Sequence, residues 1–397
     1  MKITLITQYY KPEMGAPQNR LYEMCVGLKQ LGVDVSIITG MPNYPTGKIF
    51  KEYKNKIFTS EVLDDITVKR YWLYASNSKK TIPRIFNMLS FSISSLFSLF
   101  YLIKRKNDFL IVESPPLTLG LTGWILSKLS KSKLVMNISD LWPLSAKELG
   151  AINGDGFIYK SLESVERFLY KKSAFCLGQS QEIVDYIKAH GAKEVYLFRN
   201  GVDPSRFENY TRTFEKTNKP LILTYAGLLG FAQGIYGICK NINFKEINAE
   251  FHIYGAGGEQ SEIEEFIKDY PNNGIYYHGK VSREEIPNVL KFSDCTLIPL
   301  VKNIYGAVPS KIYESMASGL PIIFSGEGEG KNIVETNNLG WISDSLDYEK
   351  LKLNIQIAAQ SPELLKEKSK NCIACANEKF NRPKQIKALY EYIKCYK

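Results

Sequence analysis

The chain has 397 residues, a length that corresponds to two or three domains of ordinary size. Its composition, 44% hydrophobic and 23% charged, is that of an average globular protein, which excludes a disordered chain, a collagen and a small disulfide-rich scaffold. The net charge of +10 indicates an anionic partner such as a nucleic acid, an anionic lipid surface or a phosphorylated substrate. A nucleic acid is disfavoured, because the lysines are dispersed and no nucleic-acid-binding motif accompanies them.

The cysteines and the first residues predict a cytoplasmic protein. Seven scattered cysteines are typical of reduced thiols in the cytosol. Cys372 and Cys375 form a CxxC pair, but no second pair or histidine cluster completes a zinc site, so a structural role is favoured. Residues 1–7 are too short an apolar run for a signal peptide and lack a small-residue cleavage site.

The first half of the chain alternates short apolar strands with helices. Residues 2–7 form the first predicted strand, and a loop that contains Gly15 leads into a helix whose apolar residues recur at helical spacing until Gly32. Strands separated by helices are typical of βαβ units in a parallel sheet. Further strands are expected at 33–39, 109–113, 133–138 and 174–177, and further helices through 124–126 and around 158–170.

An apolar segment interrupts this alternation. Residues 85–103 carry no charge, and basic residues stand on both sides of them. The length approaches that of a membrane-spanning helix, but five serines, an asparagine and the two basic flanks argue against a span. Three interpretations stay open: a monotopic segment, which is favoured, a buried core helix and a true span. In the favoured interpretation, residues 79–106 bind an anionic membrane surface.

In the second half the alternation lapses and then restarts. Residues 206–219 are polar, and Ser282 and Glu285 have the spacing of a capping box that opens a helix to Phe292. Strands are expected at 221–225, 250–254, 274–278, 294–299 and 321–325. We therefore predict an α/β protein with two doubly wound parallel-sheet domains, 1–205 and 206–378. The ligand site is expected in a cleft between them, at the carboxyl ends of the strands.

The strongest chemical signal is the segment VPSKIYESMASGLPIIF at 308–324. Its Pro309 and Ser310 are helix-start residues, and a helix N-terminus attracts phosphate. Lys311 and Glu314 share one face of that helix. This pair suits a nucleotide sugar, with the cation on the diphosphate and the carboxylate on the ribose hydroxyls. A plain surface ion pair would have the same spacing.

Glycines follow three of the predicted strands, where backbone N–H groups can approach a pyrophosphate. None of these loops is a dinucleotide fingerprint with an acidic residue about 20 positions further on, so an NAD enzyme is disfavoured. The loop residues predicted to bind the donor are Gly227, Gly230, Gly255, Gly257, Gly326, Gly328 and the intervening Glu327.

The histidines and carboxylates predict no metal site. His252 and His278 lie in or at the end of predicted strands, and packing or hydrogen bonding is favoured over ligation for both. The chain contains no Asp-x-Asp motif, a carboxylate pair that can hold a divalent metal on a diphosphate. We therefore expect no cofactor, and protein cations and helix dipoles in place of Mg²⁺.

Five segments carry a resemblance to a known family. They are TQYYKPEMGAPQNRLYEMCVGLKQLGVDVSIITGMPNYP at the start, NISDLWP at 137–143, RNGVD at 199–203, YAGLLGFAQG at 225–234 and PSKIYESMASGLPII at 309–323. With these the chain resembles the family-4 glycosyltransferases, retaining enzymes of the two-Rossmann-domain GT-B architecture. It looks most like bacterial enzymes that build O-antigen, capsule or exopolysaccharide, and closest to a fucosaminyltransferase-like branch. The resemblance also implies a C-terminal helix, 379–397, that packs back on the N-terminal domain.

The resemblance implies roles for individual residues. Glu314 would bind the donor ribose and Lys311 the diphosphate, and the turn at 326–330 would face the diphosphate with backbone donors. Gly15 would lie near the donor phosphate and the acceptor. Asp140 would lie near the transferring sugar, where a carboxylate can orient a hydroxyl or take a proton, or else cap the following turn.

Three positions depart from the family pattern. Gly306 stands where many members have the first of two glutamates, and Leu228 and Gln233 stand in a segment where they commonly carry Arg and Lys. The charge of the diphosphate is then left to Lys311, helix N-termini or an arginine elsewhere in the chain.

The expected function is metal-independent, retaining transfer of a sugar from a nucleoside diphosphate, with UDP as the expected nucleotide. The expected sugar is an N-acetylated amino sugar such as N-acetylfucosamine. The expected acceptor is an undecaprenyl-diphosphate-linked or other membrane-bound saccharide at the inner face of the cell membrane. Two alternatives stay open: a non-catalytic glycosyltransferase-like partner protein, and a nucleotide-sugar epimerase of the same fold.

Overall fold

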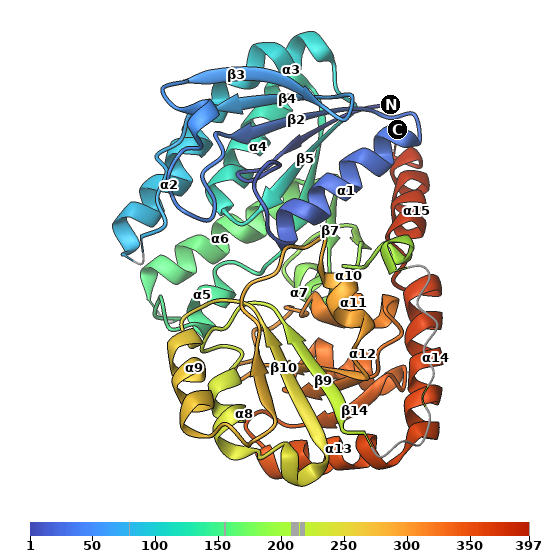
Figure 1. The fold of residues 1–397 in the computed structure, drawn as a ribbon. Helices are drawn as coiled ribbons and strands as arrows, with labels where there is room; N and C mark the ends of the chain where they lie inside the picture. Colours follow the sequence, from blue (N-terminus) through green and yellow to red (C-terminus); the bar gives the residue numbers. More distant parts are fainter. Residues whose placement is uncertain (79, 155, 208–213, 215–218, 397) are drawn as a thin grey trace. The chain divides into compact units, whose positions relative to one another are not determined.

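The structure is a computed structural model that describes residues 1–397 except 79, 155, 208–213, 215–218 and 397 (Figure 1). The chain divides into two compact units. Unit 1 comprises Met1–Arg199 and Pro383–Lys397, and unit 2 comprises Asn200–Arg382. Most of the polar stretch at 206–219, from which the predicted boundary was taken, lies outside the described residues.

The structure places the unit boundary before residue 200, six residues earlier than the boundary predicted at 205/206. The reason is a pairing between the two segments that connect the units. The Val202 N–H donates to the Phe380 carbonyl at 3.0 Å, and the Arg382 N–H donates to the Val202 carbonyl at 2.8 Å. These bonds attach residues 200–207 to the end of unit 2, so the C-terminal segment joins unit 1 only from Pro383 on.

Unit 1 is built on a sheet with the order β3-β4-β2-β1-β5-β6-β7-β8. All neighbours are parallel except β3 and β4, an antiparallel hairpin that the sequence analysis did not predict. This hairpin turns at Asp64 and Asp65, whose φ angles are +48° and +58°. The strands are β1 (Lys2–Ile6), β2 (Asp34–Gly40), β3 (Phe58–Leu63), β4 (Ile66–Tyr71), β5 (Phe109–Ser114), β6 (Lys133–Ile138), β7 (Phe175–Gly178) and β8 (Val195–Leu197).

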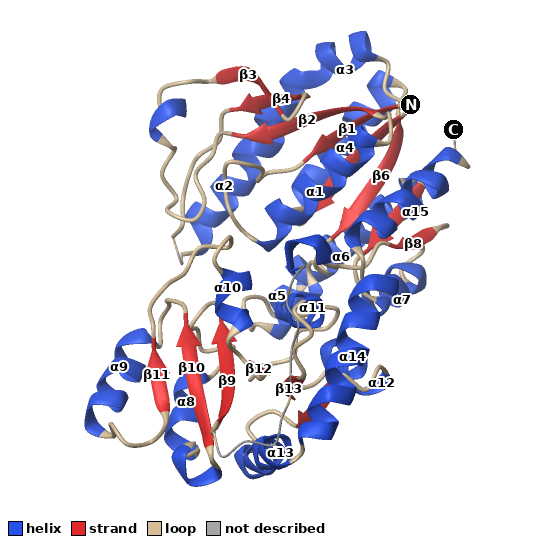
Figure 2. Ribbon diagram, turned by 45° about the vertical axis from the view of Figure 1, so that its right-hand side comes forward, coloured by secondary structure: helices blue, strands red, loops and turns tan. Residues whose placement is uncertain are grey.

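Helices cover both faces of this sheet because its central strands are apolar on both sides. Ile3 and Ile111 belong to a core that α1 and α15 close, whereas Leu110 and Val112 belong to a second core closed by α4, α6 and α7. Gly27 of α1 leaves room for Ile386 of α15, and the two helices lie side by side in Figures 1 and 2. The helices are α1 (Ala16–Gln30), α2 (Thr81–Ser94), α3 (Leu99–Arg105), α4 (Leu117–Ser130), α5 (Leu144–Glu148), α6 (Phe157–Lys172), α7 (Gln181–Ala189) and α15 (Arg382–Lys394).

The apolar segment forms α2 and α3, joined by a 3-10 turn at Ser95–Ser98. Residues 82–105 are long and apolar enough to cross a membrane by composition, with a mean hydropathy of 1.6, yet only 33% of the stretch is buried. Its buried side is rich in serine: the Ser92 hydroxyl donates to Thr118 Oγ1 at 2.9 Å, and Ser95 and Ser98 are fully buried. Most of the bulky apolar side chains are exposed, although Phe91 and Leu102 are fully buried, so the segment is not a fully buried core helix.

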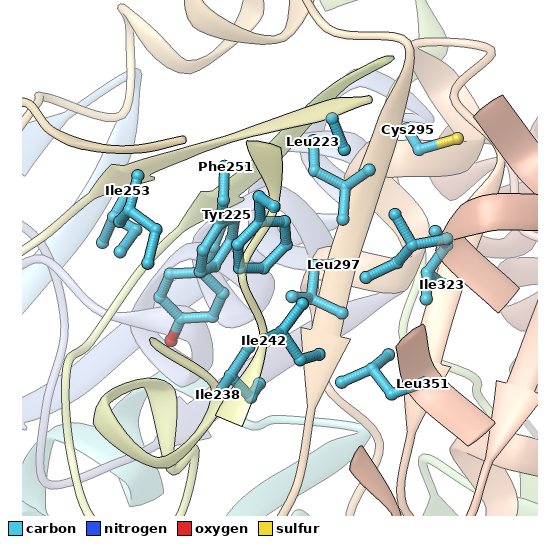
Figure 3. Packing of buried hydrophobic residues seen from close by; sticks show 14 of the residues in the cluster. Leu223, Tyr225, Ile238, Ile242, Phe251, Ile253, Cys295, Leu297, Ile323 and Leu351 are labelled. Atoms are coloured by element: carbon cyan, nitrogen blue, oxygen red, sulfur yellow. The ribbon is translucent and has the colours of Figure 1, made fainter. Parts of the chain in front are cut away.

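Unit 2 is a parallel sheet with the order β11-β10-β9-β12-β13-β14, flanked by helices on both faces. Leu223, Tyr225 and Leu297 of its central strands pack against Ile238 of α8 and Leu351 of α13 (Figure 3). The strands are β9 (Leu221–Ala226), β10 (Ala249–Tyr254), β11 (Ile275–Tyr277), β12 (Cys295–Pro299), β13 (Ile322–Ser325) and β14 (Gly340–Ser343). The helices are α8 (Ile235–Asn241), α9 (Gln260–Asp269), α10 (Ile286–Lys291), α11 (Lys311–Ala317), α12 (Glu329–Thr336), α13 (Tyr348–Gln360) and α14 (Pro362–Glu378).

The two doubly wound sheets confirm the predicted α/β fold class. The capping-box prediction was wrong about the start of its helix, since α10 begins at Ile286 rather than after Ser282. Residues 283–285 form a turn instead, and the Glu285 carboxylate accepts from the Ser282 N–H at 2.8 Å. Cys372 and Cys375 are free thiols buried in α14, as expected of a structural pair.

Candidate functional site

The strand order places a candidate site in each unit. In a doubly wound sheet the chain adds strands first on one side of the first strand and then on the other. Ligands bind at the carboxyl ends of the two adjacent strands where this order reverses. The pair is β1 and β5 in unit 1, and β9 and β12 in unit 2. The loop with Gly15 follows β1, the loop with Gly227 and Gly230 follows β9, and the connection from β12 leads to Lys311.

In unit 2 the Lys311 ammonium lies at the carboxyl end of β9. Its Nζ is 4.9 Å from the centre of the Tyr225 ring, and a Cβ on Gly227 would be only 2.6 Å from it. Within the described residues, no carboxylate forms an ion pair with this ammonium and no acceptor takes a hydrogen bond from it. Burial lowers the pKa of Lys311, and the charge of Glu314 opposes that shift. A desolvated cation that makes no ion pair or hydrogen bond is the feature that an anionic ligand needs.

Helix α11 begins at Lys311, with Ser310 at its N-cap and Glu314 in its first turn. Ser315 holds the helix on the sheet: its hydroxyl accepts from Thr296 of β12 at 2.8 Å and donates to the Lys311 carbonyl at 2.8 Å. Lys311 and Glu314 thus come from a helix whose position is set by buried hydrogen bonds. The plain surface ion pair, the alternative explanation of their spacing, is not what the structure shows.

The glycines after β9 and β10 allow two loops to touch. A Cβ on Gly255 would overlap the Gly227 carbonyl, and one on Gly257 would overlap the Leu229 carbonyl. The Gly227 N–H donates to the Tyr254 carbonyl at 2.8 Å, so this close contact is also hydrogen-bonded. Gly255 and Gly257 were predicted from the sequence to bind the donor. The sides on which their Cβ atoms would stand are filled by the neighbouring loop.

Two further loops were selected as donor-binding. Gly326 and Gly328 have φ angles of +151° and +80°, and the turn that they form leads into α12, with Gly328 as its N-cap. Glu327 between them is exposed. A Cβ added to Gly230 would lie 3.1 Å from the flexible Gln233 side chain, a tight contact, and 3.7 Å from Leu228, an ordinary one. The N-terminus of α8 is occupied by the chain itself, because the Glu259 carboxylate accepts from the Ile235 N–H at 3.0 Å.

In unit 1 the predicted residues follow two different strands. Gly15 is the N-cap of α1 in extended backbone, and Gln18 folds over it. Asp140 follows β6, is partly exposed, and accepts from the Leu141 backbone N–H. Burial raises the pKa of Asp140 against that hydrogen bond. Helix α5 (Leu144–Glu148) has no side-chain cap, so Asp140 does not cap it, and a role near the transferring sugar stays a prediction.

A buried polar cluster that was not predicted from the sequence lies at the ends of β5, β6 and β7. Arg20 of α1 forms an ion pair with Glu113 at 2.9 Å, and Glu113 also accepts from Asn137 and Ser139. Gln179 joins the cluster through Arg20. Burial raises the pKa of Glu113 to about 7, although Arg20 and Asn137 lower it. The position of Glu113 at the carboxyl end of a predicted strand was the available signal.

The two strand histidines contact each other. His252 Nδ1 lies 2.9 Å from His278 Nε2, and the rings stack with centroids 5.1 Å apart. This agrees with the hydrogen-bonding role predicted for them. In the part of the chain that the structure describes, no group of three or more His, Cys, Asp or Glu side chains is arranged to hold a metal ion.

Comparisons with known proteins agree with this architecture. Residues 15–201 match the family model described as glycosyl transferase 4-like domain, and residues 207–378 match glycosyl transferases group 1. The Escherichia coli K12 protein named as a colanic acid biosynthesis glycosyl transferase, WcaI, is 25% identical over 347 residues, 82% of this chain and 84% of its own.

Solved structures share the fold over the whole chain. A sucrose-phosphate synthase from Thermosynechococcus elongatus superimposes with a TM-score of 0.74 at 16% identity, and Anabaena HepE in complex with UDP does so with 0.73 at 14%. Both alignments cover 100% of each chain. The fold is therefore GT-B, and since the two family models together span most of the sequence, the chain belongs to the glycosyltransferases that join a glycosyl transferase 4-like domain to a group 1 domain.

Proposed function

We propose that this glycosyltransferase moves a sugar from a nucleoside diphosphate to a lipid-linked saccharide during assembly of a surface polysaccharide, with retention at the anomeric carbon. The observation that carries the donor half is the Lys311 ammonium, which lies at the carboxyl end of β9 against Gly227 and makes no ion pair or hydrogen bond with the described residues. Two phosphates of a donor would supply that partner. Glu314, one turn further along α11, is then the proposed acceptor for the ribose hydroxyls.

UDP is the proposed nucleotide. Support comes from HepE, which shares the fold and whose solved complexes contain UDP and UDP-glucose. The product class is supported by the name of the Escherichia coli relative, which refers to colanic acid biosynthesis. The transferred sugar that we propose is an N-acetylated amino sugar such as N-acetylfucosamine, and the sequence resemblance alone supports it.

The proposed chemistry is a substitution at the anomeric carbon. The bond from this carbon to the diphosphate oxygen breaks, a bond to the acceptor hydroxyl oxygen forms on the same face, and the hydroxyl proton passes to the departing diphosphate. The protein contributes position and charge stabilisation, for which Lys311 is the proposed cation. Asp140 is the proposed group in unit 1 that orients a sugar hydroxyl. No metal is assigned a role, and metal independence is part of the proposal.

The acceptor is assigned to unit 1 because that unit carries the exposed apolar segment with its basic flanks. Ile82 and Phe100 are 67% and 84% exposed, and Lys104 follows them. Apolar side chains beside lysines favour a monotopic position on an anionic membrane surface. A membrane-bound acceptor is then within reach of a protein that acts from the cytoplasmic face.

Thermal unfolding with a panel of UDP-, GDP-, ADP- and TDP-sugars tests the donor site. A donor at 100 times its dissociation constant should stabilise the folded protein by about 2.7 kcal/mol. One nucleotide class should stabilise the wild type and not Glu314→Ala, whereas Glu335→Ala, an exposed glutamate of α12, should respond like the wild type. If no donor stabilises the wild type, or if the two variants respond alike, the site is elsewhere. Donor binding without transfer or donor hydrolysis would favour a non-catalytic partner protein.

A further inference from the structure

An open apolar groove lies in unit 1 between the β3–β4 hairpin and α2. Its volume is about 1270 Å³, and aromatic and aliphatic side chains form nearly all of its surface. Phe58 and Trp72 line it from the hairpin side, and Phe86, Ile93 and Phe97 line it from α2 and the turn that follows. The sheet ends here, because β3 is the edge strand.

The groove is exposed although its lining is apolar. Trp72 is 46% exposed, Phe86 59%, Ile93 61% and Phe97 78%. Contiguous apolar surface of this kind marks an interaction site, since single exposed apolar residues are ordinary but a lined concavity of them is not. The occupant must therefore present a hydrocarbon surface.

A second pocket adjoins the groove and shares Ile57 and Trp72 with it. Its volume is about 730 Å³, and its lining comes from residues 47–57 with Met41, Trp72 and Ala75. Of the described residues that line it, four are lysines and none is acidic. The four lysines are Lys48, Lys51, Lys54 and Lys56. An apolar groove thus opens directly beside a cationic pocket, a charge pattern that fits a hydrocarbon chain with an anionic head.

We propose that the groove and the pocket together bind one polyprenyl diphosphate, with the isoprenoid chain in the groove and the diphosphate among the lysines. This inference rests on the proposed function, in which the acceptor saccharide is attached to a lipid. It adds to that function a place where the carrier itself is recognised, apart from any recognition of its sugar.

The groove is distinct from the surface by which α2 and α3 would lie on a bilayer. Ile82 and Phe100 belong to the same apolar stretch and are equally exposed, but neither lines the groove. A flat membrane surface would engage outward-facing side chains such as these. A concave space between two elements instead accepts a single chain that leaves the membrane. Ile82 and Ile93 therefore provide a matched pair of exposed isoleucines on one helix.

Binding of farnesyl diphosphate to the full-length protein in solution, without vesicles, tests the proposal. Tryptophan fluorescence reports it, since Trp72 lines both spaces, and Trp72→Phe should remove the response. Farnesol, which lacks the anion, and inorganic diphosphate, which lacks the chain, should each bind at least about tenfold more weakly. Ile93→Asp should weaken farnesyl diphosphate binding by about tenfold or more, because it places a carboxylate against the chain, and Ile82→Asp should change it by less than about twofold.

A double variant, Lys51→Glu with Lys54→Glu, tests whether the lysines bind the diphosphate. Lys104→Glu on α3 is the control for a change of charge outside the pocket. The double variant should weaken farnesyl diphosphate binding, and its binding should equal that of farnesol to the wild type. Equal losses in Ile93→Asp and Ile82→Asp would overturn the groove, as would absence of any response in the wild type. The donor site is separate, so unchanged UDP-sugar stabilisation in all these variants distinguishes a failure of the groove from a failure of the proposed function.

Discussion

Substitution of Gly227 by alanine should weaken donor binding and leave the fold intact. A Cβ at this position would stand 2.6 Å from the Lys311 ammonium nitrogen and closer still to the adjoining Cε. Both atoms are the far end of a flexible side chain, so Lys311 can swing away while the backbone stays in place. The backbone of Gly227 has no positive φ that an alanine would strain. The cost to stability should stay under about 1 kcal/mol, because alanine also reduces the entropy of the unfolded chain.

The loss in binding follows from the interaction that Lys311 would make. A charge-assisted hydrogen bond to a phosphate contributes roughly 1.5–3 kcal/mol, so displacement of the ammonium should raise the dissociation constant of UDP by about 10- to 150-fold. Calorimetric titration with UDP measures this change. Urea unfolding measures the stability beside it.

Two further variants test the reasoning behind Gly227→Ala. Lys311→Met removes the ammonium, and Gly227→Ala should then add no further loss of affinity, since the two changes act on one interaction. Gly255→Ala is the contrasting glycine: its Cβ would overlap the Gly227 carbonyl, which is backbone and cannot swing away, so a loss above about 3 kcal/mol is expected. Wild-type UDP affinity in Gly227→Ala, or additive losses in the double variant, would refute the displacement of Lys311.

Three other predictions concern pH, packing and metal. Burial raises the pKa of Glu166 to about 7, so between about pH 4.5 and 7 the folded state keeps a proton that the unfolded state has lost, and stability falls as pH rises through that window. In urea unfolding, Glu166→Gln should reduce the loss of unfolding free energy across this pH window by about 1–3 kcal/mol. An unchanged loss would contradict the raised pKa of Glu166. Leu389→Ala, at a fully buried position of α15, should cost about 2–5 kcal/mol, whereas the exposed Lys387→Ala should cost under about 0.5 kcal/mol; equal costs would mean that α15 is not part of the core. EDTA should leave sugar transfer unchanged, and a loss of transfer that a divalent ion restores would reject metal independence.

The local sequence pattern was sufficient to predict the helix that carries much of the candidate donor site. Lys311 and Glu314 lie three residues apart after a strand, and helical geometry alone puts them on one face. What the pattern left open was whether the lysine meets another charge. That depends on Tyr225 and Gly227, which lie more than 80 positions earlier in the chain and reach Lys311 only through the pairing of β9 with β12.

The cluster around Glu113 shows the same limit in unit 1. Arg20 and Glu113 are 93 residues apart, and neither stands in a local motif that names the other. Their ion pair follows from β1 and β5 being neighbours, which places α1 beside the end of β5. A single buried charge would be costly without its partner, so the pair exists only once the sheet order has formed.

The sequence by itself determined the alternation of strands and helices, the two parallel sheets and the helix that carries Lys311, because hydrophobic periodicity and helix-start residues act over a few positions. Tertiary structure decided which loops touch, where the buried ion pair forms and where the apolar groove opens beside its lysines. The β3–β4 hairpin illustrates the difference. Its edge strand β3 becomes one wall of a groove only when α2 packs with Phe91 and Ser92 toward the core and leaves Phe86 and Ile93 exposed.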